Sequence, residues 1–201
     1  MAASGEEIIV AHVPLPPAKH FRSTWIVSSQ RALRERDLFA RYVDLLPPQH
    51  HEVVLQCVAA TWVPMADVVA HYRACDALEL STDEQVALGE MVSDRVQGSI
   101  FATVVKMAKG AGVTPWTILP HFRRLWERGA DGGSVAVYKR GPKEARIELV
   151  GCALFEIPYF RAAMRGVITG IVKQFCRKAF ISEVARAAAP RDSILLRLQW
   201  V

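Results

Sequence analysis

The sequence predicts an α+β protein in which an N-terminal helical lobe packs on a C-terminal β-β-α-β-β antiparallel sheet lobe. Two observations predict this class. From about residue 29 to residue 128, apolar side chains recur at helical spacing between prolines. After Gly129, short runs alternate apolar and polar residues, and one amphipathic helical segment separates two pairs of such runs. With 201 residues, 51% of them hydrophobic, the chain has enough apolar material for one domain with a substantial core.

The first elements follow from proline placement and residue type. Residues 1–21 are expected to form an extended tail, and residues 22–201 a single domain. The β-branched and aromatic residues of Arg22–Ser29 predict a short strand. Apolar residues at helical spacing predict one or two helices over Gln30–Leu46, and the prolines that follow end this pattern and start a helix to about Cys57.

The rest of the helical lobe carries clearer boundary signals. Pro64 suits the first turn of a helix. Ser81 and Glu84 form a capping-box pattern, which predicts a long helix reaching toward Lys106. Pro115 opens a further helical segment, and Pro120 inside it predicts a kink or break, because proline removes one backbone hydrogen bond.

The sheet lobe is predicted over residues 129–201. Two alternating runs on either side of Gly141-Pro142 predict a hairpin. The segment Pro158–Lys178 has one broad apolar face and a basic opposite face, which indicates an amphipathic helix. Two further strands are expected, within Ala179–Ala188 and Ser193–Trp200.

Composition narrows the classes of function. No apolar run approaches the length of about 20 residues that spans a bilayer, and Glu6 and Glu7 stand where a secretory signal would be basic, so a cytoplasmic protein is expected. The four cysteines are far apart, which favours free thiols over a zinc site. Residues 121–201 hold 15 Lys and Arg against 7 Asp and Glu. These charges alternate with apolar residues, so a solvated surface is favoured over nucleic-acid binding.

The C-terminal segment resembles a known superfamily. Its aromatic-rich helix carries Arg165-Gly166, a strand follows over Lys178–Val184, and a closing strand over Leu195–Trp200 ends in tryptophan. This order is similar to the ligand-binding fold that H-NOX, 4-vinyl reductase and TRAPP-type proteins share. Residues 22–201 together resemble a myxobacterial paralogous family of unknown function. The superfamily includes haem-based gas sensors, small-molecule sensors and vesicle-tethering subunits, so the resemblance leaves the chemistry open.

Two departures from these relatives reduce the case for a metal. A haem-binding H-NOX is expected to carry a Tyr-x-Ser-x-Arg motif, and none of the four tyrosines begins one. The 4-vinyl reductase type often has a cysteine cluster before the last strand, where this chain reads AAAPRDSILL. No metal site is therefore expected, apart from His121, which has aromatic neighbours and would be the axial ligand if haem were bound.

The candidate ligand-binding residues are of two kinds. Large aromatic side chains could line a pocket between the lobes or simply form the core. Arg161 and Arg165, four residues apart on one helix, could hold a carboxylate or phosphate, or remain solvated. The complete candidate set is Trp62, Trp116, His121, Phe122, Trp126, Phe155, Tyr159, Phe160, Arg161 and Arg165.

No catalytic motif is visible: the sequence lacks a P-loop, a G-x-S-x-G elbow and a G-x-G-x-x-G loop. A non-enzymatic sensor or regulatory module is therefore the leading hypothesis. It would bind a small apolar or amphipathic ligand between the lobes and pass its state to a partner. The alternatives are a TRAPP-like interaction scaffold or homodimer with a packed interior, and a haem-based gas sensor.

Overall fold

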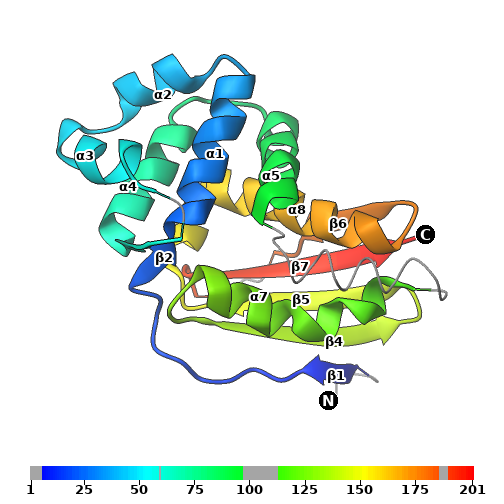
Figure 1. The fold of residues 1–201 in the computed structure, drawn as a ribbon. Coiled ribbons are helices and arrows are strands. Elements are labelled where there is room, and N and C mark those ends of the chain that lie inside the picture. The colour runs from blue at the N-terminus through cyan, green and yellow to red at the C-terminus, as the bar shows by residue number, and fades with distance from the viewer. Residues whose placement is uncertain (1–5, 59, 97–112, 186–189) are drawn as a thin grey trace.

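The computed structural model describes residues 6–58, 60–96, 113–185 and 190–201. A group of helices lies above one face of an antiparallel sheet, as Figure 1 shows. The N-terminal helices are α1 (Ser23–Glu35), α2 (Phe39–Leu45), η1 (Pro48–His50), α3 (His51–Leu55), α4 (Met65–Asp76) and α5 (Thr82–Val96). The strands β2 (His20–Arg22) and β3 (Trp62–Pro64) form a separate two-stranded ribbon within this lobe. None of the described helices is long and apolar enough to cross a bilayer.

The sheet has five strands in the order β1-β4-β5-β7-β6. They are β1 (Glu7–Val10), β4 (Ser134–Gly141), β5 (Glu144–Val150), β6 (Ala179–Glu183) and β7 (Ser193–Trp200). The short helices η2 (Pro115–Thr117) and η3 (Leu119–His121) lead into α7 (Phe122–Gly129), while η4 (Ala153–Glu156), α8 (Pro158–Val172) and η5 (Lys173–Phe175) connect β5 to β6. The predicted α+β class and the β-β-α-β-β order are confirmed.

The sheet register separates an apolar face from a charged face. Val137 pairs with Ile147, which pairs with Leu196, and all three side chains are fully buried. Successive residues of a strand point to opposite faces. The outer face therefore carries the neighbours of these residues, including Arg146, whose guanidinium contacts Glu6 and Glu148. The core lies between the inner face and the helices.

Two local sequence signals, a capping box and a proline break, predicted features of the helices correctly. Ser81 and Glu84 form the predicted capping box: the Ser81 backbone N–H donates to Glu84 Oε2 over 2.8 Å, and the Glu84 N–H donates to Ser81 Oγ over 3.4 Å. The Ser81 hydroxyl also donates to Glu84 Oε2, over 2.6 Å, and the hydroxyl and backbone N–H of Ser81 together lower the pKa of the Glu84 carboxyl. The predicted break at Pro120 is confirmed, because Pro120 lies in η3 and α7 begins after it. The predicted continuation of α5 toward Lys106 lies outside the described residues.

The predicted strand over Arg22–Ser29 is wrong, because Ser23 begins the helix α1. Ile26, Ser29, Gln30 and Leu33 are all buried and follow one another at the i, i+3, i+4, i+7 spacing of a helix face. Packing of this face outweighs the strand propensity of the β-branched and aromatic residues. The helical lobe thus begins six residues earlier than the predicted residue 29.

The N-terminal segment is extended, as predicted for residues 1–21, but it forms part of the fold. Residues 7–10 make β1, which pairs antiparallel with β4 and lies at the edge of the sheet in Figure 1. Further along, the Gly133 N–H donates to the Pro16 carbonyl and the Ala18 N–H donates to the Gly151 carbonyl, both over 2.8 Å. The prediction that the sheet is confined to residues 129–201 is therefore wrong, because an edge strand comes from the other end of the chain.

Helices α5 and α8 approach one another closely through glycine. A Cβ added to Gly166 would lie 2.0 Å from the Val86 carbonyl oxygen, and one added to Gly89 would lie 2.0 Å from that of Ala163. Since real Cβ atoms essentially never come within 3.0 Å of such atoms, each position requires glycine. This close packing fixes α8 between α5 and the sheet.

Candidate functional site

A cavity of about 320 Å³ lies where the two lobes meet. It is bounded by α1 and β2 at the start of the helical lobe, by α5, by α7, by α8 and by strands β4 and β5. The volume falls at the lower end of the range of about 300–1,000 Å³ that is usual for small-molecule sites. The lining residues are Arg22, Thr24, Trp25, Ala60, Ser93, Phe122, Leu125, Trp126, Arg128, Gly129, Val135, Leu149, Met164, Val167, Ile168 and Ile171.

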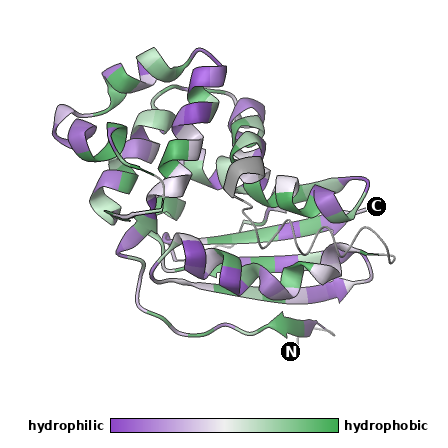
Figure 2. Ribbon diagram, viewed as in Figure 1, coloured by the Kyte–Doolittle hydropathy of each residue, from purple (hydrophilic) through white to green (hydrophobic). Residues whose placement is uncertain are grey.

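The walls of the cavity are formed by the apolar faces of two amphipathic helices. Along α7, hydrophilic and hydrophobic residues alternate within each turn, as Figure 2 shows. Phe122 and Trp126 of α7 are four residues apart, so they share the face that points inward. Met164, Val167 and Ile168 of α8 face them from the other side. The periodicity that builds the core therefore also builds the cavity walls.

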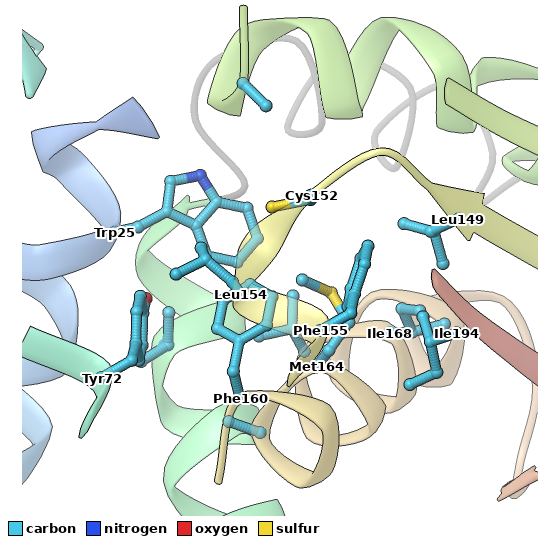
Figure 3. Close-up of a cluster of buried hydrophobic side chains, with 14 of the residues drawn as sticks. Trp25, Tyr72, Leu149, Cys152, Leu154, Phe155, Phe160, Met164, Ile168 and Ile194 are labelled. Atoms are coloured by element: carbon cyan, nitrogen blue, oxygen red, sulfur yellow. The ribbon is translucent and has the colours of Figure 1, made fainter. Parts of the chain in front are cut away.

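Rigid aromatic packing supports these walls. The rings of Trp126 and Phe155 are stacked, with centroids 5.8 Å apart and planes inclined by 20°. The Trp126 indole N–H donates to the Gly132 carbonyl over 2.8 Å, which fixes the ring. Figure 3 shows Phe155 and Met164 in one cluster of buried side chains together with Trp25 and Phe160. Part of the cavity wall is consequently an extension of the core.

Two of the ten predicted site residues, Phe122 and Trp126, line the cavity. Phe155 lies directly behind Trp126, and Tyr159 and Phe160 are buried deeper, next to Tyr72. These three aromatic side chains support the cavity from the core, as the alternative interpretation of the aromatics expected.

Three more of the predicted residues lie away from the cavity. The Trp116 indole packs edge-on against Trp200, with centroids 5.1 Å apart, and donates to the Pro142 carbonyl. His121 ends η3 with an exposed side chain and is not among the residues that line the cavity. Trp62 is 41% exposed on β3, but the guanidinium of Arg22, which does line the cavity, lies 4.2 Å from the centre of its ring.

The two predicted arginines have different surroundings. Arg161 is engaged within the fold: it forms an ion pair with Glu183, and its Nη1 donates to the carbonyls of Phe155 and Ser193 over 2.6 and 3.0 Å. Arg165 is partly buried, and its Nε has no hydrogen-bond partner among the described residues. Neither arginine lines the cavity.

Sequence reasoning missed the cationic residues that do line the cavity, Arg22 and Arg128. They are more than a hundred residues apart, and no local pattern connects them. Met164, Val167, Ile168 and Ile171 could have been proposed, because all four belong to the apolar face predicted for the helix after Pro158.

The side chains that could ligate a haem iron lie elsewhere. All six histidines, four cysteines and four tyrosines of the chain fall within the described residues, and none of them lines the cavity. No group of three or more His, Cys, Asp or Glu that could hold a metal ion occurs in the described part of the chain. The described cavity walls are apolar, with charge supplied by Arg22 and Arg128.

A second set of titratable residues is buried in the helical lobe. Desolvation lowers the pKa of His71 to about 3 and raises that of the Tyr42 hydroxyl, which the nearby Cys75 raises further. The protonated Tyr42 hydroxyl therefore donates to the neutral His71 ring at Nδ1, over 2.6 Å. Both residues have no exposed surface, so this pair stabilises the packing of α2 on α4 and is inaccessible to a substrate.

Comparison with solved structures finds H-NOX proteins. The H-NOX protein from K. algicida in its unliganded Fe(II) form superposes with a TM-score of 0.66 at 8% identity, covering 90% of this chain and 96% of that one. An H-NOX mutant from S. oneidensis in an Fe(II) state gives 0.63 at 12%, over 90% and 96% of the two chains. A structure from work on haem redox potential and porphyrin distortion gives 0.55 at 14%, over 89% and 97%.

These similarities establish an H-NOX-like fold over nearly the whole chain. At such low identity they establish the fold alone. No protein-family model and no curated protein sequence matches this chain. The resemblance to a myxobacterial family therefore stays a prediction.

Proposed function

We propose that this protein is a non-catalytic sensor or regulatory module that binds a small apolar or amphipathic molecule between its helical lobe and its sheet. The observation that carries the proposal is the cavity of about 320 Å³ at the junction of the lobes. The alternative of an interaction scaffold with a packed interior predicts no such cavity. The H-NOX-like fold supports the proposal, since solved structures with this fold are described in Fe(II) and haem forms.

The position of the cavity suits signalling. Its walls come from α1, α5 and α7, from α8 and from the sheet, so a ligand contacts elements that could shift relative to one another. A ligand changes a conformational equilibrium only by its difference in affinity for two states. A molecule that contacts several elements at once can have different affinities for two arrangements of the lobes, because a shift of one lobe would change its contacts.

Haem does not fit the residues that are present. A haem iron needs an axial His, Cys, Tyr or His/Met set from the protein. None of the histidines, cysteines or tyrosines of the chain lines the cavity, and Met164 alone would be a weak ligand. The exposed position of His121 removes the basis for its expected role as the axial ligand. The proposed ligand is therefore a molecule without iron.

The proposal is tested with the neutral fluorescent dye Nile red and two matched variants. Leu125→Trp adds an indole to a residue that lines the cavity, whereas Leu45→Trp makes the same change on the exposed side of α2. Wild type and Leu45→Trp are expected to bind one dye per chain saturably, and Leu125→Trp to bind at least tenfold more weakly. Equal binding by both variants, or no saturable binding by wild type, would overturn the proposal.

A denaturing extraction of freshly purified protein complements the titration. Mass spectrometry of the extract is expected to identify a stoichiometric small molecule that is absent from Leu125→Trp. Absorbance near the Soret region is expected to be absent. A stoichiometric Soret band in wild type would contradict the argument against haem.

A further inference from the structure

The apolar cavity carries two arginines at its boundary. Arg22 ends β2, immediately before α1, and Arg128 lies in the last turn of α7. Both are among the residues that line the cavity, whereas the described lining includes no aspartate or glutamate. The site thus combines a long apolar wall with local positive charge.

Arg22 is held in a fixed orientation. Its Nη1 donates to the Ala60 carbonyl over 2.8 Å, and its guanidinium carbon lies 4.2 Å from the centre of the Trp62 ring. A guanidinium has five N–H groups, and described residues accept one of those of Arg22. A planar cation stacked on an aromatic ring loses little further conformational freedom when it binds an anion.

Arg128 of α7 differs in its partners from four arginines of the sheet lobe. Arg140, Arg146, Arg161 and Arg197 each form an ion pair with a glutamate. Among the described residues, none forms an ion pair with Arg128, whose side chain is exposed where it borders the cavity. Placement near the end of α7 stabilises a cation modestly through the helix dipole, but this effect does not require a position at the cavity.

We infer that the ligand is an anionic amphiphile, a single apolar chain or small ring system with a carboxylate or phosphate head group, and that Arg22 and Arg128 bind the head group. This inference rests on the proposed function. The apolar part lies against Phe122, Leu125, Met164 and Val167, and its burial supplies affinity. The forked guanidinium donors match the paired oxygens of either anion, which gives selectivity over neutral molecules of the same length.

The test is displacement of Nile red from the 201-residue chain by decanoate, decyl phosphate and decanol, which share one alkyl chain. At least one of the two anions is expected to displace the dye at about tenfold lower concentration than decanol, because a charge-assisted hydrogen bond contributes about 1.5 kcal/mol or more. Preference for decanoate alone identifies a carboxylate, preference for decyl phosphate alone a phosphate, and equal preference a site that accepts either.

Variants assign the selectivity to these arginines. Arg128→Gln is expected to reduce the anion preference about fivefold and to leave displacement by decanol unchanged. Arg124→Gln removes the same charge from an exposed residue of α7 that does not line the cavity, and is expected to preserve the preference. Arg22→Lys keeps the charge and loses the fork, so a smaller reduction is expected.

The failures of the two proposals are distinguishable. If decanol displaced the dye as well as both anions, the inferred ligand class would be wrong. If Arg124→Gln and Arg128→Gln had the same effect on the anion preference, the assignment of the head group to Arg128 would be wrong. Dye binding that is weakened in Leu125→Trp but not in Leu45→Trp would still support the proposed function. If wild type bound no Nile red, both proposals would be overturned.

Discussion

The contact between α5 and α8 gives a prediction that can be worked out from distances. In Gly166→Ala the new Cβ would lie 2.0 Å from the Val86 carbonyl oxygen and 2.9 Å from the Glu90 nitrogen. Both are backbone atoms of α5, so neither can rotate away as a side chain would. The two helices must therefore separate by about 1 Å to bring the contact to the 3.0 Å that real Cβ atoms respect.

Two opposing effects set the magnitude. Within an isolated helix, replacing glycine by alanine stabilises by about 1 kcal/mol. Overpacking that forces backbone shifts costs about 1–3 kcal/mol. Moving α5 and α8 apart would also weaken the second close contact between them, where a Cβ added to Gly89 would lie 2.0 Å from the Ala163 carbonyl oxygen. We expect a net loss of about 1–2 kcal/mol in the free energy of unfolding, a large fraction of the stability of a domain.

Urea unfolding followed by circular dichroism measures this loss as a lower midpoint at unchanged slope. Gly141→Ala is the matched control: nothing lies within 4 Å of the added Cβ, and Gly141 is outside the left-handed backbone region. Its unfolding free energy is expected to change by less than about 0.5 kcal/mol. Gly166→Ala should also weaken Nile red binding, because α8 forms one wall of the cavity. Gly166→Ala protein as stable as Gly141→Ala would refute the reasoning.

Burial lowers the pKa of His71 from 6.5 to about 3, so below pH 6.5 the unfolded chain binds a proton that the folded chain excludes. The unfolding free energy should therefore fall by about 1 kcal/mol between pH 6 and pH 5, and His71→Gln should lose this contribution; identical pH slopes in urea titrations would contradict it. Asp131→Ala removes the acceptor of the Lys19 and His20 backbone N–H groups, at 2.7 and 2.8 Å. Because these hydrogen bonds are exposed and water can replace the lost acceptor, the change should cost about 1 kcal/mol in the same assay, and a loss below about 0.5 kcal/mol would show that this tether is dispensable. Glu6→Gln removes a charge that contacts Arg140 and Arg146 and should increase hydrogen exchange in β1, whereas unchanged protection would mean that strand pairing alone holds the segment.

Local sequence patterns determined much of the fold. The hairpin around Gly141-Pro142 follows from the alternation of apolar and polar residues on either side of it. Successive side chains of a strand point to opposite faces, so this alternation gives each strand one apolar face that can be buried. The capping box at Ser81 and the break at Pro120 are also readable, since each depends on hydrogen bonds within a few residues. The broad apolar face of the segment that forms α8 predicted a helix packed on one face of the sheet.

Tertiary structure decided the rest, because those features depend on residues far apart in the chain. The Ser23–Glu35 segment is a helix because its face at Ile26 and Leu33 has a core to fill. Strand β1 exists because β4, more than a hundred residues later, offers an unpaired edge.

The candidate site divides in the same way. The sequence by itself supplied Phe122, Trp126 and the apolar face of α8, since amphipathic periodicity marks which side chains turn inward. It could not tell that Trp116 and His121 lie outside the cavity. Only the packing of the two lobes placed Arg22 beside the same cavity as Arg128, because a site assembled from distant segments leaves no periodic trace in any one of them.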